Sequence, residues 1–424
     1  MWSLIGNLSL PLLLGSGSAA PAIDAGSPDT PPEVLAALAL DDDRQVRLKV
    51  AANPGTPADA LLALGLADRS PEMGLALARN PGTDAWMLTN IVATNESAEV
   101  RRAALANSKT PLEALAALAN DYDEPVRHAA IDRLAALPVD ELLALTGDFE
   151  PSVRAAVAAS ATASVDVLTR LAGDASARVR AVVAGNANTP ADVLAMLAED
   201  EQELVLISVA ANHATPPQAL AILGTDWDTT VESVVAHNPM TPPATLGELA
   251  GHEDALVRYH AAGNPGTPTA ALGLLADDAD RDVRRRVAGN AHTPVEQLIR
   301  LAADDEDLVR VLVANNASTP GQALDLLAGD PEATVRIVVA RHQNTPAITL
   351  DRLAGDEDEL VRLALAGNPM APPGALAKLA GEVESDLREA VARNPNTPAA
   401  VLAGLSADKD ELVRQAAAGN PGRP

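Results

Sequence analysis

The sequence predicts an all-α solenoid of about fifteen two-helix repeats. The first observation is a proline that recurs every 26 residues: Pro190, Pro216, Pro242, Pro268, Pro294, Pro320, Pro346, Pro372, Pro398 and Pro424. A fixed period of roughly 20 to 50 residues is typical of repeat architectures. The second observation is a composition of 47% apolar residues with only 1% aromatic ones. A continuous core of Ala, Val and Leu follows, with helices that pack closely.

The third observation is the helical pattern inside one repeat. Thr189 has the side chain of an N-cap, and Pro190 follows at the expected first helical position, where its missing N–H costs nothing. Asp192 complements the dipole of this first helix. The acidic loop from Asp200 starts the second helix, and Asn212 ends it. Each repeat is therefore predicted to form two helices joined by short turns.

Both helices carry one apolar stripe at helical spacing. The stripes consist of Leu194, Leu197 and Ala198, then Val205, Val209 and Ala210. Helices of about ten residues are too short to stand alone in water. Stacked neighbours must therefore bury each other's stripes along the whole array.

The array is expected to fill residues 29–424, and residues 1–28 do not fit the repeat. Two interpretations of this first segment are open. Its apolar residues and small residues resemble a secretory signal, but no Lys or Arg precedes Arg44, and Pro11 interrupts the apolar stretch. The alternative is a cap on the first repeat, since terminal repeats need one. We expect a cytoplasmic protein, with secretion as the alternative.

The repeat resembles the leucine-rich repeat variant family. The shared pattern is V-R-x-x-V-A-x-N-P-x-T-P-x-x-x-L-x-x-L-A-x-D, illustrated by Val283, Arg284, Asn290, Thr293, Pro294, Leu298, Leu301 and Asp304. The resemblance covers roughly residues 29–424 and implies a right-handed superhelix of paired helices, with the second helix of a pair either α or partly 3₁₀. The slightly longer period here favours two α-helices, closer to HEAT repeats. For function, the family implies a surface for macromolecular contacts.

Charge and cysteine content exclude several functions. The formal net charge is −27, and such an acidic surface repels phosphate backbones and anionic membranes, so we expect neither a nucleic-acid nor a membrane partner. Some relatives carry a cysteine-rich iron–sulfur segment, but this chain has no cysteine. The aspartate loops lack the spacing of a calcium-binding EF-hand. We therefore expect no cofactor and no metal.

Two strictly repeated polar positions are predicted to be structural. One is an arginine column: Arg47, Arg101, Arg127, Arg154, Arg180, Arg258, Arg284, Arg310, Arg336, Arg362, Arg388 and Arg414. Nearby carboxylates favour a ladder of Arg–carboxylate pairs between repeats over a basic stripe for an anionic ligand. The other is an asparagine column: Asn53, Asn80, Asn107, Asn186, Asn212, Asn238, Asn264, Asn290, Asn316, Asn368, Asn394 and Asn420. Asparagine tolerates the left-handed conformation and bonds nearby backbone, which suits a helix end.

Binding residues are expected where the repeat varies. Just after the arginine column most repeats carry Ala, Val, Ile or Leu, but one neighbourhood contains His237, Tyr259, His260, Arg285 and Arg286. Stacked helices place equivalent positions about 10 Å apart, so these side chains could form one surface. Tyr, His and Arg together have the composition of an interaction hot spot. The alternative is independent variation of solvated residues.

A second candidate set consists of loop aromatics. Tyr122, Phe149 and Trp227 occupy the same loop position in three repeats. Exposed, they could anchor a partner; folded back, they would pack on the adjacent helix.

The most economical function is a non-catalytic scaffold whose variable surface binds a protein or peptide. The alternative is a HEAT-like repeat enzyme or an accessory of a modification system, of the lyase type, with a polar pocket on the concave face. Convergence of the variable side chains into a deep pocket would favour catalysis, whereas a broad shelf would favour binding. The sequence offers no catalytic residues, because its seven histidines fall at unrelated positions and no phosphate loop appears. It leaves the oligomeric state open.

Overall fold

The protein is built from short helices arranged in pairs. The computed structural model describes residues 24–225 and 228–422, and within these ranges it contains thirty α-helices and no strand. The helices form fifteen pairs at a spacing of about 26 residues. The predicted all-α solenoid of two-helix repeats is confirmed.

The first helices of the pairs, in chain order, are α1 (Pro32–Leu38), α3 (Ala58–Ala67), α5 (Ala85–Thr94), α7 (Leu112–Leu118), α9 (Val139–Leu145), α11 (Val165–Leu171), α13 (Ala191–Leu197), α15 (Pro217–Leu223), α17 (Pro243–Leu249), α19 (Thr269–Leu275), α21 (Val295–Leu301), α23 (Gly321–Leu327), α25 (Ala347–Leu353), α27 (Pro373–Leu379) and α29 (Ala399–Leu405). The second helices are α2 (Arg44–Ala52), α4 (Pro71–Arg79), α6 (Ala98–Ala106), α8 (Glu124–Ala135), α10 (Pro151–Ala159), α12 (Ala177–Gly185), α14 (Glu203–Ala211), α16 (Thr229–His237), α18 (Ala255–Gly263), α20 (Arg281–Gly289), α22 (Asp307–Asn315), α24 (Ala333–Arg341), α26 (Glu359–Ala366), α28 (Ser385–Arg393) and α30 (Glu411–Gly419).

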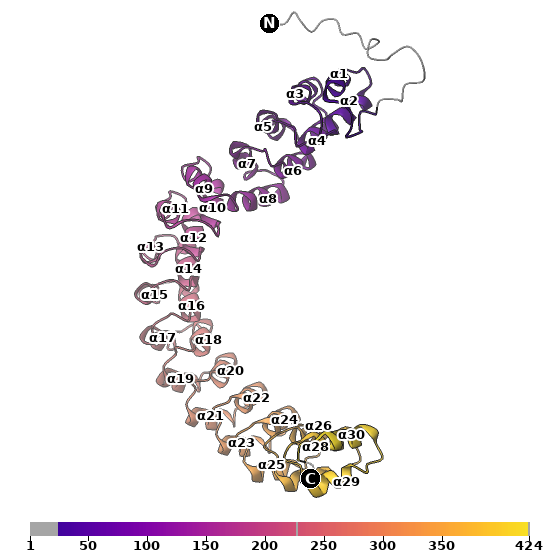
Figure 1. Cartoon of the computed structure of the whole chain (residues 1–424). Helices are drawn as coiled ribbons and strands as arrows, with labels where there is room; N and C mark the ends of the chain where they lie inside the picture. The colour runs from indigo at the N-terminus through magenta and orange to yellow at the C-terminus, as the bar shows by residue number, and fades with distance from the viewer. Residues whose placement is uncertain (1–23, 226–227, 423–424) are drawn as a thin grey trace, which may run out of the picture. The chain divides into compact units, whose positions relative to one another are not determined.

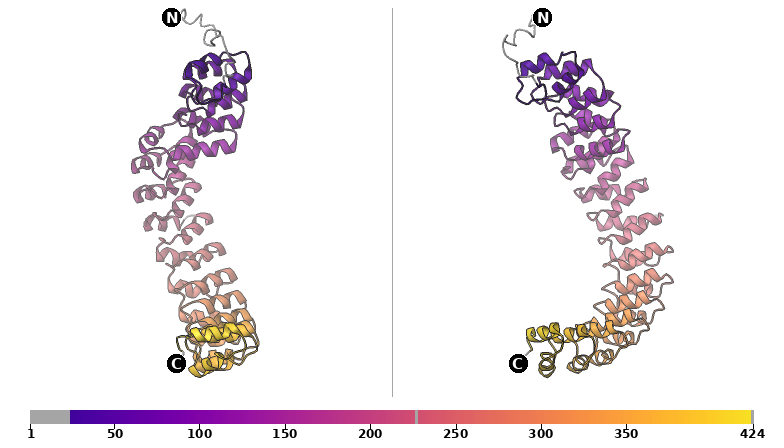
Figure 2. Two further views of the ribbon diagram at one scale, coloured as in Figure 1. Left: turned by 45° about the vertical axis from the view of Figure 1, so that its right-hand side comes forward. Right: turned by 90° about the vertical axis from the view of Figure 1, so that its right-hand side faces the viewer.

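The helices divide into two compact units, residues 1–188 and residues 189–424. Within each unit the first helices form one row and the second helices form another, as Figure 1 shows. In the second unit, consecutive second helices contact each other extensively, whereas consecutive first helices meet at only a few positions. Closer packing on one side bends a stack towards that side. The second helices therefore line the inner side of this unit's curve, as the labels in Figure 1 show. Figure 2 gives two turned views of the same chain.

The core of each unit lies between the two rows. In the repeat described above, Leu194, Val205, Val209 and Ala210 are fully buried, and Leu197 is 2% exposed. These are the stripes that the sequence predicts. The helices are shorter than predicted, with seven residues in α13 and nine in α14, so each depends on its neighbours for burial.

The start of the first helix differs from the prediction. In α13 the N-cap position is Pro190, in an extended conformation with φ −61° and ψ 149°, and no side chain caps the helix. The predicted N-cap role of Thr189 is therefore wrong, and the proline lies one residue earlier than expected. In the next repeats the equivalent threonine donates a hydrogen bond to the preceding second helix. For example, Thr215 Oγ1 donates to Val209 O at 2.6 Å. The last turn of the preceding second helix has free carbonyls that need such donors.

Buried asparagines tie each repeat to the one before it. Asn264 Nδ2 donates to Ala236 O and Asn238 O, both at 2.8 Å, and its Oδ1 accepts from the Gly266 N–H at 2.9 Å. The same three bonds recur at Asn53, Asn80, Asn107, Asn186, Asn238, Asn290, Asn316, Asn368, Asn394 and Asn420. Asn264 has φ −73° and ψ 129°, so the predicted left-handed conformation is wrong: extended backbone aims the amide at the previous repeat.

The arginine column forms the predicted ladder. Arg284 donates from Nε and Nη2 to the two carboxylate oxygens of Asp304 in the next repeat, at 2.7 and 3.0 Å, and from Nη1 to Asp278 O at 2.9 Å. Equivalent two-bond pairs are Arg101–Asp121, Arg154–Asp174, Arg258–Asp278, Arg310–Asp330, Arg336–Asp356 and Arg388–Asp408. The hydrogen bonds from Arg388 lower the pKa of Asp408 to about 2. The ladder is therefore held in its charged form.

The next aspartate in the loop caps the second helix. Asp280 Oδ1 accepts from the N–H groups of Asp282 at 2.7 Å and Val283 at 3.4 Å. Helix capping thus accounts for the Asp-x-Asp loops, as predicted.

Histidines replace one ladder residue and one residue of the asparagine column. Glu232 stands in the arginine column, and His252 stands where the aspartate belongs; His252 Nε2 lies 2.9 Å from Glu232 Oε2, and His252 Nδ1 accepts from the Asp254 N–H. His342 stands in the asparagine column, with Nε2 3.1 Å from Asn316 O and Nδ1 accepting from the Asn344 N–H. An imidazole reproduces part of each hydrogen-bond pattern, which explains why the repeat survives these changes.

One ladder rung is poorly formed and should be improvable. Arg362 Nη2 lies 3.8 Å from Glu382 Oε2, and Arg362 Nε is buried without a hydrogen-bond partner. Glu382 replaces the usual aspartate. We expect Glu382→Asp to restore the two-bond pair and to raise the free energy of unfolding by about 1 kcal/mol. Urea unfolding and hydrogen exchange in α26 and α28 would measure it. The control is Glu357→Asp, because the Glu357 side chain is 92% exposed; a gain of the same size there would contradict the explanation.

The N-terminal segment is described only from Asp24. Residues 1–23 lie outside the described residues, and with them most of the segment for which a signal or a cap is expected. Residues 24–28 form a turn in which Ala25 O and Ser27 O accept bonds from Asn53 Nδ2 at 2.9 and 2.7 Å. The loop pattern of the repeat thus extends back to Asp24. Among the helices of the described residues, none has the length and apolar character to span a membrane.

Candidate functional site

Each second helix has one side that the core does not cover. In α20 the residues packed in the core are Val283, Val287 and Ala288. The opposite side carries the second, fifth, sixth and ninth helix residues, which are Asp282, Arg285, Arg286 and Gly289. We call these four positions, taken over consecutive second helices, the second-helix face. In the second unit it lies on the inner side of the curve.

The predicted variable residues all fall on this face. His237 comes from α16, Tyr259 and His260 from α18, and Arg285 and Arg286 from α20. The rings of His237 and His260 meet edge to face with centroids 5.1 Å apart, and those of Tyr259 and His260 meet at 5.3 Å. The Arg286 guanidinium lies over the Tyr259 ring, 4.3 Å from its centroid. The structure therefore brings four of the five side chains into one line of contacts.

The two arginines of α20 differ in their partners. Arg285 pairs with Asp282 at 2.5 Å and with Glu306 of the next repeat at 3.2 Å. Arg286 makes no ion pair with any residue that the structure describes, and it lies across Gly263, where an added Cβ would come within 3.2 Å of it. Glycine at this position therefore leaves room for the stacked guanidinium. Among the patch residues, Arg286 therefore carries a positive charge that no described carboxylate pairs with.

Burial also changes the chemistry of His260. Desolvation lowers its pKa from the ordinary value, and the nearby charges of His237 and Arg286 add to the effect. Its Nδ1 is buried without a hydrogen-bond partner. At neutral pH the imidazole is therefore uncharged, and it contributes aromatic contact rather than positive charge.

The second-helix face is hollowed between neighbouring helices at the same register in three places. Between α18 and α20 the depression measures about 320 Å³, and its wall includes Tyr259, Arg285, Arg286 and Leu312. Between α26 and α28 the equivalent depression measures about 290 Å³. The recurrence shows that these hollows are a property of the repeat.

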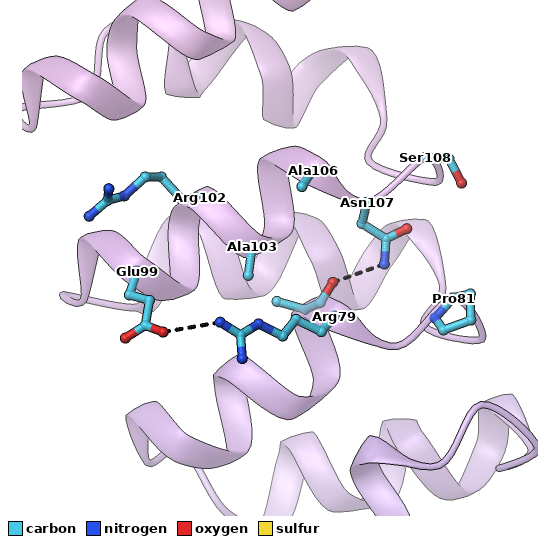
Figure 3. A pocket seen from close by; sticks show the side chains of 9 residues that line it. Arg79, Pro81, Glu99, Arg102, Ala103, Ala106, Asn107 and Ser108 are labelled. Carbon is cyan, nitrogen blue, oxygen red and sulfur yellow. Dashed lines mark hydrogen bonds and ion pairs between the residues drawn. The ribbon is translucent and has the colours of Figure 1, made fainter. Parts of the chain in front are cut away.

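The third depression lies in the first unit, between α4 and α6, and measures about 820 Å³ (Figure 3). Arg79 of α4 extends to Glu99 of α6, where Nη2 lies 3.1 Å from Oε1. The small side chains of Ala103 and Ala106 leave the hollow open, and Arg102 stands at its edge. Arg102 occupies the same helix position as Arg285, so charged residues recur at this point of the face.

Sequence reasoning missed an apolar surface beside the predicted patch. On α22, α24 and α26 the second-helix face carries seven aliphatic residues, none of them buried: Leu308, Val311, Leu312, Ile337, Val338, Leu360 and Leu363. We call these seven residues the apolar platform. Leu308 is 48% exposed and Leu360 58% exposed. The sequence does show Val, Ile and Leu after the arginine column in these repeats. Most other repeats also carry Ala, Val, Ile or Leu there, so these residues do not stand out as Tyr259 and Arg286 do.

Exposed leucines on the first helices do not form such a surface. Leu274 and Leu326 are 73% and 54% exposed, but Arg300 stands at the equivalent position between them and Arg352 at the next one. Single exposed apolar residues are ordinary, whereas a contiguous apolar surface indicates an interaction site. The apolar platform is therefore the distinctive feature.

The two loop aromatics that the structure describes have different surroundings. The Tyr122 hydroxyl donates to Glu96 O at 2.6 Å and accepts from Arg101 Nη1, and the Arg101 guanidinium lies 4.1 Å from its ring centroid. Tyr122 is thus folded back onto the ladder. Phe149 is 92% exposed. Trp227 lies outside the described residues.

The same face holds no arrangement typical of metal binding. Over residues 24–225 and 228–422, no group of three or more His, Asp or Glu residues is placed to hold a metal ion. The polar side chains of the predicted patch contact one another, as the His237–His260 and Tyr259–Arg286 contacts show.

The repeat matches a known family. Residues 386–410 match the family model described as leucine rich repeat variant. This stretch contains most of α28, the buried Asn394 of the asparagine column, α29, the ladder residue Asp408 and the N-cap residue Asp410. The same elements recur about every 26 residues. The chain is a helical repeat protein, and its repeat is similar to the leucine-rich repeat variant.

Two solved structures are similar to this variant-repeat chain. One is described as a leucine-rich repeat variant with a novel repetitive protein structural motif; it is 28% identical, the match covers 52% of this chain and 88% of that one, and the TM-score is 0.40. The other is the X-ray structure of YibA of E. coli, 18% identical over 70% of this chain and 96% of that one, with a TM-score of 0.26. No curated protein sequence matches the chain.

Proposed function

We propose that this variant-repeat array is a non-catalytic scaffold that holds a protein or peptide partner on the second-helix face of its second unit. The observation that carries the proposal is the apolar platform, where aliphatic side chains of three consecutive second helices remain uncovered. Leaving such a surface in water is unfavourable, by about 25 cal/mol for each Å² of apolar area. A partner that covers the platform recovers this free energy.

The predicted patch extends the same surface by three helices, α20, α18 and α16. Leu312 of the platform also lines the depression that contains Tyr259 and Arg286. A stacked Tyr–Arg pair beside aliphatic residues has the composition of an interface hot spot. The alternative function, catalysis in a polar pocket, has weaker support because His237 and His260 contact each other and neither is among the residues that line the depression beside Tyr259 and Arg286.

Affinity capture from a lysate of the source organism would test this proposal with matched variants. The first variant, Leu308→Asp/Leu360→Asp, charges the platform. The control, Leu274→Asp/Leu326→Asp, charges two comparably exposed leucines on the first helices. The third variant, Tyr259→Ala/Arg285→Ala/Arg286→Ala, removes the predicted patch.

We expect proteins retained by the wild type and by the control to be lost from the platform variant and reduced on the patch variant. Charged groups placed in an apolar interface would be desolvated without a partner, which explains the loss. Equal retention by the wild type and the platform variant would reject the second-helix face as the binding surface.

A further inference from the structure

The apolar platform offers a partner almost no hydrogen bonds. On α22, α24 and α26 the second, fifth and sixth positions are aliphatic apart from Thr334, and the polar residues Asn315 and Arg341 stand at the ninth position, at the C-terminal ends of α22 and α24. The amides of the asparagine column are buried between repeats, where Asn316 and Asn368 each already donate two bonds to backbone carbonyls. An extended peptide laid on this surface would leave backbone N–H and C=O groups facing it without partners. An α-helix satisfies its own backbone groups.

The size of the surface also suits a helix. Neighbouring helices pack about 8–10 Å apart, so α22, α24 and α26 span about 20 Å along the row. At 1.5 Å per residue, a helix of about 13 residues covers that length, and about 7 more residues reach α20. The second helices α22 and α24 are nine residues long and α26 is eight, or about 12–14 Å, which accommodates the roughly 10 Å diameter of a bound helix.

Charges at the two ends of the platform differ in sign, and Arg341 at the ninth position of α24 is a further cation between them. At the α20 end, Arg286 is stacked on Tyr259 and makes no ion pair with a described residue. At the α28 end, the face presents the carboxylates of Asp386 and Glu389, and Arg393 pairs with Glu389 only. An acidic side chain is attracted to the first end and repelled from the second. The platform therefore distinguishes the two ends of an acidic partner segment.

We infer that the apolar platform binds an amphipathic α-helix of another protein, with an acidic end of that helix over Arg286. This inference rests on the proposed scaffold function and specifies the partner's chemistry. The partner's apolar stripe covers the seven platform residues. Its carboxylates meet a guanidinium that the Tyr259 ring and Gly263 hold in place.

Fluorescence anisotropy with synthetic helical peptides tests the inference on the full chain. The first probe is an amphipathic peptide of about 20 residues with a leucine stripe and glutamates at one end. The second probe replaces these glutamates by lysines. The third probe keeps the glutamates but carries central prolines, which prevent a helix. Circular dichroism reports helix formation on binding.

We expect the glutamate probe to bind at least about tenfold more tightly than the lysine probe. Leu308→Asp/Leu360→Asp should abolish its binding, Arg286→Glu should weaken it about tenfold, and Leu274→Asp/Leu326→Asp should leave it unchanged. Far-ultraviolet spectra and unfolding midpoints of the variants identify any that fail to fold, and Arg286→Ala serves as the milder second variant.

Four results would overturn the inference. Equal binding of the proline probe would indicate that the partner segment is extended. Equal binding of the lysine probe, or no binding of any probe, would rule out an acidic helix as the partner. Self-association of the wild type in sedimentation, abolished by Leu308→Asp/Leu360→Asp, would instead assign the platform to a second copy. If the probes fail while lysate proteins still depend on the platform, the scaffold function stands and only the helical partner is rejected.

Discussion

The Asn394→Ala variant is expected to lose about 3 kcal/mol of unfolding free energy. Asn394 is 3% exposed, and its Nδ2 donates to Ala366 O and Asn368 O, both at 2.7 Å. Its Oδ1 accepts from the Asn396 N–H at 2.9 Å. The alanine removes three hydrogen bonds and leaves buried backbone groups without partners, each at a cost of about 1 kcal/mol. Urea unfolding, with hydrogen exchange resolved by repeat, would locate the loss at the α26–α28 interface.

The control for this variant lies two residues away in the same loop. Asn396 is exposed, and its side chain bonds Pro369 O. We expect Asn396→Ala to change stability by less than about 0.5 kcal/mol, as for most surface substitutions. Similar losses in both variants would contradict the role assigned to the buried asparagine column.

Removing one ladder arginine should be about equally damaging. Arg310 donates to both oxygens of Asp330, at 2.6 and 3.0 Å, and the two side chains are only 12% and 4% exposed. Arg310→Ala leaves the Asp330 carboxylate buried without its counter-ion, which costs about 3–5 kcal/mol. The double variant Arg310→Ala/Asp330→Ala should lose less than the single one, because no orphan charge remains. Chemical unfolding of both variants would measure the difference.

Arg414 provides the comparison for this prediction. Its Nη1 donates to Asp408 O and Lys409 O, and no carboxylate of a described residue pairs with it. Arg414→Ala should therefore cost only about 1 kcal/mol. If Arg310→Ala and Arg414→Ala cost the same, the carboxylate pair contributes nothing and the ladder interpretation is wrong.

The sequence predicted the fold well because the repeat displays the same physical constraints fifteen times. The proline period and the stripes at Leu194 and Val205 are local patterns, and the arginine ladder could be inferred from carboxylates nearby in sequence. The threonines and asparagines were misassigned in detail. Thr215 bonds the helix behind it, and Asn264 bonds the previous repeat; both partners become visible only when the helices are stacked.

The candidate site was predicted only in part. Tyr259 and Arg286 were found because unusual residues stand out in a repeat, and their contact was within reach of a stacking argument. Leu308 and Val338 look like ordinary core residues in sequence. Only the structure shows that the second, fifth and sixth positions of the second helix face away from the core. An apolar residue at a repeat position is therefore informative once its side of the helix is known.

The direction of the inter-repeat bonds has a consequence for synthesis. Each asparagine amide reaches back to carbonyls of the repeat before it, and each ladder aspartate meets an arginine that precedes it by 20 residues. A repeat that leaves the ribosome therefore finds its acceptors and its cation already in place on the nascent chain. Folding can therefore follow translation one repeat at a time, without contacts from any distant segment. The apolar surface left exposed on the nascent chain is then never larger than the stripe of a single repeat.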